Sequence, residues 1–238
     1  MQSYHIYGHF YDATQGAPSG AQYLHLLRKH HPTAKSLLEI ACGTGAQLLP
    51  LSKHYAVAGL DASGTMLRYA RKKLPGVTFF HQDMAGFNVD RTFDAIICPF
   101  DSMNHLLQFG DWVRTFKAAK RHLNDNGVFI FDTNTDYKLR QMIDAPAVVH
   151  RFGDHYMIMK VFAAVGGVTD WDIKILEQRR NKSYHLHREI IKERAYTHDR
   201  ILAALRRTFK QVRAYDVKGW SRPKKDSSRL YYVCQNDS

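Results

Sequence analysis

The stretch "LLEIACGTGAQ", residues 37–47, is the most informative part of the chain. Its first residues are mostly apolar, as in a buried strand, and Gly43 and Gly45 follow with one residue between them. Glycine lets a backbone come close to a ligand, and the N-terminus of a helix favours an electron-rich group. Because open α/β sheets bind ligands at the carboxyl ends of their strands, this loop marks the expected site. Taken alone, the glycine pair fits a structural strand–helix corner equally well.

Apolar runs and amphipathic stretches alternate on both sides of this loop. We predict strands at 36–40, 56–60, 77–83, 93–100 and 128–132, and helices at 20–30, 45–54, 63–74 and 111–123. The sequence "NDNG", 124–127, is expected to separate the last of these helices from the fifth strand. Strands that alternate with helices indicate a mostly parallel sheet with helices on both faces, so the predicted fold class is doubly wound α/β.

The pattern changes after the fifth strand. From about Val148 to Tyr196 the apolar residues alternate or cluster in short runs around a Gly166–Gly167 turn, which indicates antiparallel strands. Thr197 then caps a short helix, and two closing strands return to the core. We therefore predict one domain over 1–238, which consists of an N-terminal segment at 1–19, a core at 20–135 and 197–238, and an antiparallel β insert at about 146–196 between the fifth strand and the last helix.

Composition narrows the setting of the protein. The chain has 238 residues, a formal net charge of +12 and three widely spaced cysteines, which suit reduced thiols. The amino terminus lacks the layout of a secretion signal, and no apolar run approaches the ~18 residues that span a bilayer. We therefore expect a cytoplasmic protein with no membrane partner. The positive charge fits either a solvated basic face or a nucleic-acid partner, but few aromatic residues interleave with the basic runs as a stacking surface requires.

Acidic residues follow the next two predicted strands. Asp61 stands close to the ~20 residues after the glycine loop at which a carboxylate meets ribose hydroxyls in a nucleotide-binding fold. Its alternative role is to cap the helix that follows Ser63. Asp83 is placed to accept from an exocyclic adenine amine while the Met84 backbone meets a ring nitrogen. Features at the ends of three successive strands thus form one constellation.

This constellation resembles the class I, Rossmann-like S-adenosylmethionine-dependent methyltransferases of the small-molecule type. The resemblance implies a seven-stranded, mostly parallel sheet with an antiparallel last strand, S-adenosyl-L-methionine as cofactor and S-adenosyl-L-homocysteine as product. It also implies that the 1–19 segment covers the cofactor. Leu48 stands where a nicotinamide dinucleotide fingerprint has its last glycine, which argues against that cofactor. The residues assigned to the cofactor by this resemblance are Tyr11, Glu39, Ala41, Cys42, Gly43, Gly45, Asp61, Ala62, Met66, Asp83, Met84, Pro99 and Phe100.

The segment "FDSMNHL", 100–106, lies where the acceptor pocket of such enzymes opens. The candidates for catalysis are His105, Tyr11 and Asp101. His105 is either a proton acceptor or a helix-start histidine bonded to a backbone carbonyl, and Tyr11 is either a cofactor contact or a structural tyrosine. The predicted acceptor contacts are Ser102, Asn104, His105, Asn134, Tyr156 and Trp171, of which the last two also fit ordinary sheet packing.

We do not expect a metal site. His185 and His187 share one face of a strand, but no carboxylate or cysteine in the flanking sequence completes a recognisable zinc pattern. A sulfonium methyl donor is already activated, so transfer is an in-line displacement that depends mainly on alignment of donor and acceptor.

The leading hypothesis is methyl transfer to nitrogen or oxygen of a small-molecule acceptor. The first rival is an RNA or other nucleic-acid methyltransferase, which the Cys98-Pro99-Phe100-Asp101 sequence disfavours because base-amine enzymes carry Asn/Asp-Pro-Pro-Tyr/Phe at this point. The second rival is a cofactor-binding module without catalysis. The sequence leaves open the identity of the acceptor, the choice between nitrogen and oxygen, the need for a base, and whether the insert pairs two copies in a homodimer.

Overall fold

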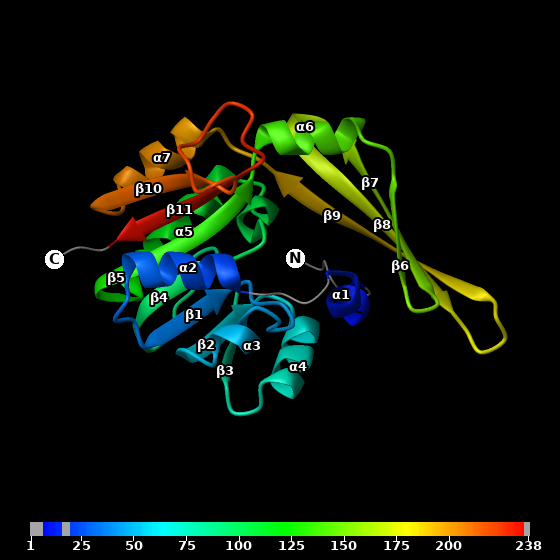
Figure 1. The fold of residues 1–238 in the computed structure, drawn as a ribbon, viewed down its shortest axis with the longest axis horizontal. Coiled ribbons are helices and arrows are strands. Elements are labelled where there is room, and N and C mark those ends of the chain that lie inside the picture. The colour runs from blue at the N-terminus through cyan, green and yellow to red at the C-terminus, as the bar shows by residue number, and fades with distance from the viewer. Residues whose placement is uncertain (1–6, 16–19, 236–238) are drawn as a thin grey trace.

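A seven-stranded sheet forms the centre of the molecule (Figure 1). The computed structural model describes residues 7–15 and 20–235, so the rest of the predicted 1–19 segment lies outside the described residues. The strands lie in the order β10-β11-β5-β4-β1-β2-β3, and β11 runs antiparallel to both of its neighbours. This arrangement confirms the predicted mostly parallel sheet. The strand bounds are β1 Ser36–Ile40, β2 Ala56–Asp61, β3 Thr78–His81, β4 Phe93–Cys98, β5 Leu123–Asn134, β10 Gln211–Asp216 and β11 Arg229–Gln235.

Helices cover both faces of this sheet. One face packs against α2 (Ala21–His30), α3 (Leu48–Leu51) and α4 (Gly64–Lys73), and the other packs against α5 (Phe109–Arg121) and α7 (His198–Arg206). Strand alternation decides which side chain serves which face: Leu37 belongs to one core cluster and its neighbour Leu38 to the other. The layering is the doubly wound arrangement that alternating strands and helices predict.

Two local predictions were wrong. The predicted helix at 45–54 is reduced to α3, with four residues. The sequence "NDNG" does not end an element, because β5 begins at Leu123 and continues through it. Asn126 adopts φ 63° there, and the β4–β5 register shifts between Phe93 and Ala95, so the turn-forming residues make an irregularity within the strand.

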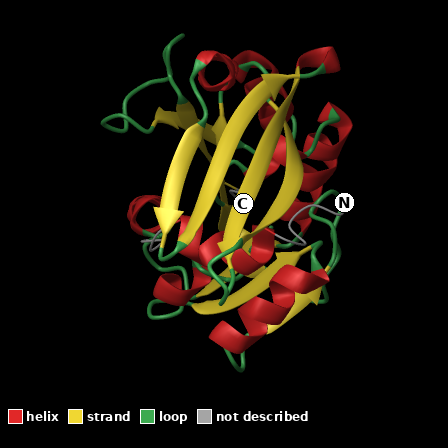
Figure 2. Cartoon of the chain, turned by 90° about the vertical axis from the view of Figure 1, so that its right-hand side faces the viewer, coloured by secondary structure: helices red, strands yellow, loops and turns green. Residues whose placement is uncertain are grey.

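The insert is a four-stranded antiparallel sheet in the order β6-β7-β8-β9 (Figure 2). Its strands are β6 Val148–Phe152, β7 His155–Ala163, β8 Val168–Gln178 and β9 Tyr184–Arg194, and α6 Asp136–Asp144, which was not predicted, precedes them. One face of this sheet is buried through Met157, Ile173 and Ile191. No helix of the described residues is long and apolar enough to cross a membrane.

The helix α1 (Tyr7–Gln15) connects the insert to the core. Phe10 packs on the buried face of the insert, where its ring centroid lies 5.9 Å from that of Phe152. On the core side, Asp12 accepts a hydrogen bond from the Thr44 hydroxyl at 2.6 Å and pairs with the Lys73 ammonium at 2.6 Å. The helix is therefore held above the glycine loop from both sides.

Candidate functional site

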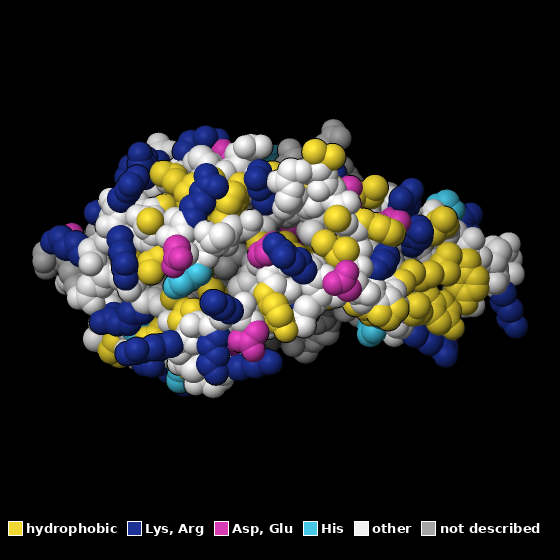
Figure 3. Space-filling view, turned by 90° about the horizontal axis from the view of Figure 1, so that it is seen from above, with side chains coloured by type: hydrophobic (Ala, Val, Ile, Leu, Met, Phe, Trp, Pro, Cys, Tyr) yellow, Lys and Arg dark blue, Asp and Glu magenta, His cyan; other side chains and the backbone are white. Residues whose placement is uncertain are grey.

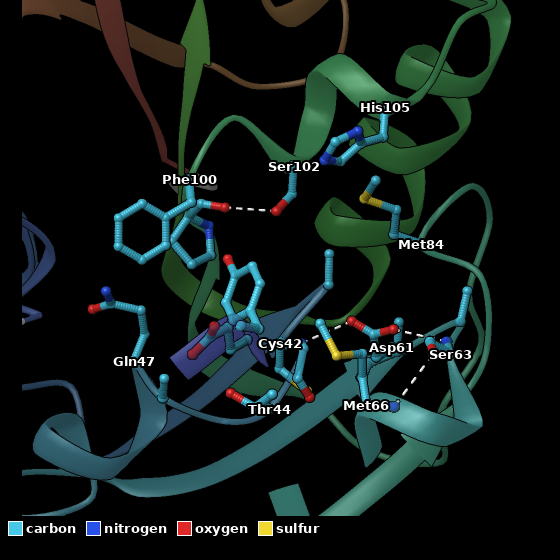
Figure 4. A pocket seen from close by; sticks show the side chains of 18 of the residues that line it. Cys42, Thr44, Gln47, Asp61, Ser63, Met66, Met84, Phe100, Ser102 and His105 are labelled. Atoms are coloured by element: carbon cyan, nitrogen blue, oxygen red, sulfur yellow. Dashed lines mark hydrogen bonds between the residues drawn. The ribbon is translucent and has the colours of Figure 1, made fainter. Parts of the chain in front are cut away.

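A cavity opens at the carboxyl ends of β1, β2, β3 and β4 (Figure 4). We call it the strand-end cavity, and its open space is about 880 Å³. Of the thirteen residues assigned to the cofactor, all but Gly45 line it. These twelve are Tyr11, Glu39, Ala41, Cys42, Gly43, Asp61, Ala62, Met66, Asp83, Met84, Pro99 and Phe100.

Asp61 holds the two sides of this cavity together. One carboxylate oxygen accepts from the Gly43 amide at 2.8 Å, and the other accepts from the Ser63 amide at 2.7 Å. Burial raises the pKa of Asp61, although the two amides oppose this effect. The capping role belongs to Ser63, whose hydroxyl accepts from the Met66 amide at 3.3 Å. Each carboxylate oxygen has two lone pairs, so Asp61 retains the capacity to accept from ligand hydroxyls.

The two glycines of the loop serve different purposes. Gly43 has φ 53°, and a Cβ added there would meet only the end of the Met66 side chain, at 3.6 Å. Gly45 has φ 71°, and its Cβ would lie 3.3 Å from Leu74 and 3.4 Å from Ala70. Both positions favour glycine because of the left-handed backbone. Gly43 thus shapes the cavity wall, whereas Gly45 packs the loop against α4 and is not brought into the cavity.

Glu39 supplies a buried polar atom that lacks a partner. The side chain is 2% exposed, and its Oε2 has no hydrogen-bond partner among the described residues. Burial and the neighbouring Asp61 raise the pKa of Glu39 well above its ordinary value. A buried acceptor without a partner is costly, so a ligand that donates at this wall would be favoured. This observation fits the polar methionine end of the cofactor that the resemblance implies.

A second cavity lies between the core and the buried face of the insert, and we call it the insert cavity. Four residues line both cavities and mark the junction between them: Tyr11, Gln47, Phe100 and His105. Asp101, Asn134 and Trp171 line the insert cavity alone, as acceptor contacts would. Its other walls include Met157 and Ile173 from the insert. The two cavities therefore lie side by side and meet at these four residues.

Asp132, at the end of β5, organises the junction. It is fully buried, and its carboxylate accepts from the backbone amides of Phe100 at 2.8 Å and Asp101 at 3.0 Å. Those two residues have φ values of 55° and 49°, a left-handed conformation that is unfavourable outside glycine. Tyr23 and Arg229 also donate to the same carboxylate. Asp132 therefore stabilises a strained turn that presents Phe100 to both cavities and Asp101 to the insert cavity.

Asp101 belongs to a buried network that reaches the insert. Arg229 donates to it at 2.8 Å, and the Asn134 amide donates to it at 2.7 Å and to Glu193 at 3.2 Å. Burial opposes ionisation of Asp101, but Arg229, together with His105 and a hydrogen bond from Glu193, more than offsets this and lowers its pKa. Burial and the charge of Asp101 instead raise the pKa of Glu193 well above its ordinary value. One negative charge of the pair is thus matched by Arg229, and Glu193 is held neutral.

His105 lies at the junction on the short helix η1 (Ser102–His105). Its Nδ1 is 3.2 Å from the Lys192 carbonyl oxygen. That geometry favours the tautomer in which Nδ1 carries the proton and Nε2 accepts. Burial lowers the pKa of His105, although Asp101, the Lys192 carbonyl and Asp61 oppose the shift. A neutral imidazole in this position can accept a proton.

Three predicted acceptor contacts lie elsewhere. Ser102 lines the strand-end cavity, and its hydroxyl donates to the Pro99 carbonyl at 2.7 Å. Asn104 is fully buried and makes hydrogen bonds to Thr133, Asn134 and Arg194, so it serves packing. Tyr156 is on the opposite face of the insert from Met157, as strand alternation requires, and its ring lies 6.1 Å from that of Tyr184.

Several residues of the site were not singled out in the sequence. These are Gln47, Tyr23, Asp132, Glu193 and Arg229. Asp132 ends the fifth predicted strand, the same position that pointed to Asp61, so one available signal was missed. Among the described residues no group of three or more His, Cys, Asp or Glu side chains is arranged to hold a metal ion. His187 instead contacts Glu177 at 2.8 Å.

Comparisons with known proteins agree with this geometry. Residues 37–127 match the family model described as a methyltransferase domain. The chain is 36% identical over 108 residues to dTDP-3-amino-3,6-dideoxy-alpha-D-glucopyranose N,N-dimethyltransferase of Streptomyces fradiae, a match that covers 45% of this chain and 42% of that protein. It is 32% identical over 139 residues to the putative methyltransferase YqeM of Bacillus subtilis, covering 56% of each. The matched stretches thus span about half the length of these relatives.

A solved structure resembles the whole chain. An S-adenosylmethionine-dependent methyltransferase from Clostridium acetobutylicum superimposes with a TM-score of 0.84 at 25% identity, over 99% of both chains. The likeness therefore includes the insert as well as the seven-stranded sheet. The match to the methyltransferase domain covers the glycine loop and Asp61, which shape the strand-end cavity. Residues 37–127 thus form a methyltransferase domain of the class I, Rossmann-like, S-adenosylmethionine-dependent type, and the whole chain shares the fold of such an enzyme.

Proposed function

We propose that this chain transfers a methyl group from S-adenosyl-L-methionine to the nitrogen of a small-molecule amine. The observation that carries the proposal is the junction of the two cavities at Tyr11, Gln47, Phe100 and His105. Methyl transfer is an in-line displacement, so the donor and acceptor must meet at one opening. The strand-end cavity would hold the donor, and the insert cavity would hold the acceptor.

The strand-end cavity fits the proposed cofactor. When bound, the cofactor supplies a methyl group activated by its sulfonium. Asp61 would accept from the ribose hydroxyls, and Asp83 and Met84 would meet the adenine edge. Glu39, whose buried Oε2 lacks a partner among the described residues, would accept from the amino end directly or through water. Tyr11, held above the loop by α1, would keep water out of the junction.

The insert cavity supports an amine as the acceptor. Its walls include the carboxyl groups of Asp101, Asp132 and Glu193 and the cations Lys138 and Arg229, of which Arg229 donates to Asp101 and Asp132. The carboxyl oxygens can accept from an N–H of an acceptor, which supports nitrogen. The relative from Streptomyces fradiae carries the name of an N,N-dimethyltransferase, which also supports nitrogen. After transfer, Nε2 of His105 would accept the proton that the alkylated nitrogen loses.

The same cavity argues against a nucleic-acid acceptor. The net charge of +12 is spread over the surface, and Figure 3 shows Lys and Arg side chains scattered over the core and the insert. A phosphate backbone would need a continuous basic track leading to the site. The carboxyl-rich walls of the insert cavity oppose phosphate instead. These features support a small molecule.

Turnover of the cofactor tests the proposal. The purified chain is incubated with S-adenosyl-L-methionine and a panel of primary amines, secondary amines, phenols and carboxylic acids. We expect release of S-adenosyl-L-homocysteine that depends on an added amine. Cofactor binding by calorimetry without release on any acceptor would favour a non-catalytic module. Salt-sensitive release stimulated by RNA would favour the nucleic-acid alternative.

His105→Ala tests the assigned proton acceptor. General base catalysis contributes about 10²–10⁴-fold to rate, so we expect turnover to fall by at least 10²-fold. Cofactor affinity, measured by calorimetry, should change less than threefold, because Asp61 and the glycine loop are untouched. His122→Ala is not a useful control since it is buried in the core, whereas His54→Ala changes a histidine remote from both cavities. An undiminished rate in His105→Ala would assign this histidine to structure.

The proposal also includes a cytoplasmic location and the pairing of two copies of the chain. The outer face of the insert exposes apolar side chains, including Val149 at 63% and Leu186 at 54%, which supports pairing through this sheet. Light scattering on the purified chain would show twice the mass of 27.5 kDa if copies pair. A mass of one chain at micromolar concentration would remove the pairing proposal.

A further inference from the structure

The indole N–H of Trp171 is a buried donor beside the insert cavity. Trp171 lies on β8 and lines that cavity. Its Nε1 is buried and has no hydrogen-bond partner among the described residues. A tryptophan N–H can only donate, and a buried donor without an acceptor costs about 1–3 kcal/mol. An acceptor atom that a ligand brought to this N–H would remove that cost.

Glu193 lies beside this donor on the same face of the insert. In the β8–β9 pairing Trp171 is opposite Ile191, and Glu193 is two residues further along β9, opposite Thr169. Diagonal neighbours of this kind are about 7–8 Å apart at the backbone, within reach of long side chains. Glu193 is 4% exposed and lines the same cavity. Its Oε2 accepts from Asn134, and a carboxyl group has further acceptor capacity.

A donor and an acceptor at this spacing select one kind of ligand group. An ammonium could donate to Glu193 but would leave the Trp171 N–H unmatched, because it has no lone pair to accept. A phosphate or carboxylate could accept from Trp171 but would face the carboxyl groups of Glu193 and Asp101. A hydroxyl accepts through its lone pairs and donates its proton at the same time. A hydroxyl can therefore accept from the Trp171 N–H and donate to the Glu193 carboxyl group at the same time.

We propose that Trp171 and Glu193 form a hydroxyl-binding subsite that selects acceptor amines carrying a hydroxyl on the same small framework. The inference rests on the proposed methyl transfer to an amine and adds a specificity determinant to it. The reacting nitrogen would lie at the junction near His105, and the hydroxyl would lie deeper, against β8 and β9. Arg229 is already engaged by Asp101, Asp132 and Asn134, so the subsite does not depend on it.

The experiment compares cyclohexylamine with 2-, 3- and 4-aminocyclohexanol as probes. The full chain is used, and kcat/KM for release of S-adenosyl-L-homocysteine is measured together with the Kd of each probe for the S-adenosyl-L-homocysteine complex. In the unmodified chain we expect one aminocyclohexanol to be preferred over cyclohexylamine by roughly 5–100-fold, the range expected when a site built for a hydroxyl meets an analogue without one. The positional isomers are included because the structure sets the direction of the hydroxyl but not the framework that carries it.

Trp171→Phe removes the N–H while keeping a flat aromatic side chain. We expect the preference for the hydroxyl to fall below about threefold, with the ratio as the readout rather than the absolute rate. Trp220→Phe is the matched control, because Trp220 lines neither the strand-end cavity nor the insert cavity, and it should keep the full preference. Glu193→Ala should also lose the preference, whereas Glu193→Gln should keep part of it, since the amide oxygen still accepts.

The outcomes separate this inference from the function on which it rests. An equal hydroxyl preference in Trp171→Phe, Glu193→Ala and the unmodified chain would overturn the subsite, as would the absence of any preference in the unmodified chain. If Trp171→Phe does not fold, as judged by its circular dichroism and thermal transition, the two Glu193 variants decide the result. Preferential binding of one isomer without any release of S-adenosyl-L-homocysteine would sink methyl transfer to these amines and leave the subsite intact.

Discussion

The two cavities are built in different ways. The strand-end cavity is assembled from strand ends and the loops that follow them, and apart from Tyr11 its lining comes from residues 39–105. The insert cavity draws on side chains from Tyr11 to Tyr231, including residues of β7, β8, β9 and the antiparallel strand β11. The first is therefore shaped by sheet topology and the second by long-range side-chain contacts. Such a division lets one fold keep a cofactor while its acceptor varies through the insert.

Asp132 connects the two cavities, and its removal should have the largest effect. Asp132→Ala leaves Arg229 without one of its carboxylates and removes the acceptor for the left-handed Phe100–Asp101 turn. Removing one partner of a buried ion pair costs about 3–5 kcal/mol, so we expect the free energy of unfolding in urea to fall by that amount. Affinities for cofactor and acceptor should both decline, because the turn borders both cavities.

A surface aspartate provides the control for this change. Asp136→Ala removes a carboxylate whose side chain is 60% exposed and pairs with Arg140, so the expected loss is below about 1 kcal/mol. If Asp132→Ala and Asp136→Ala lower the free energy of unfolding by similar amounts, Asp132 does not stabilise the turn between the two cavities. The two cavities would then be independent.

Asp61→Ala should affect the strand-end cavity and leave the insert cavity unchanged. We expect cofactor affinity to weaken by about 1–3 kcal/mol, the cost of leaving buried polar partners unmatched, here the Gly43 and Ser63 amides and the ribose hydroxyls. Calorimetry with S-adenosyl-L-homocysteine measures the loss. Asp170→Ala changes a residue of the insert that lines neither cavity, so this variant should bind the cofactor normally. An unchanged affinity in a folded Asp61→Ala protein would contradict the ribose assignment.

The difference between the cavities also explains which parts of the molecule were predictable. The core strands are short apolar runs bounded by turn residues, and the polar side chains just after them converge because parallel strands end at one edge of a sheet. Asp61 and Asp83 could therefore be assigned without knowing any contact between distant segments. Asp132 ends the predicted strand at 128–132 and lies near the carboxyl end of β5, so it was accessible by the same argument.

The helix α6 and most of the insert cavity depend on contacts between distant segments, which the spacing of apolar residues does not predict. The helix α6 buries only Leu139, so its apolar stripe is too weak to identify it. Glu193 and Arg229 reach the site only because the insert folds back over the core and β11 enters the sheet between β5 and β10. Tyr156 and Trp171 looked equivalent as aromatic residues of the insert, but the pairing register turns them to opposite faces.

The smallest expected effect is a pH-dependent change in the free energy of unfolding, which Glu193 in the insert cavity should cause. Its pKa in the folded chain is raised by burial and by Asp101, with Asn134 and Arg229 opposing, whereas the unfolded chain has a glutamate pKa of about 4.3. Below about pH 4.3 the group is protonated in both states. As pH rises, the unfolded chain loses the proton first, so the contribution of Glu193 to stability is lost progressively up to its raised folded pKa. Each unit of that rise corresponds to about 1.4 kcal/mol.

Glu193→Gln isolates this contribution, because an amide has no proton to lose in this range. Urea unfolding of both proteins between pH 5 and 8 should show the variant gaining on the unmodified chain as pH increases. Asp101 does not add to the difference, since its lowered pKa keeps it ionised in both states throughout this window. Parallel stability curves would mean that Glu193 ionises normally inside the folded chain, and the carboxyl pair would then carry two charges against the single guanidinium of Arg229.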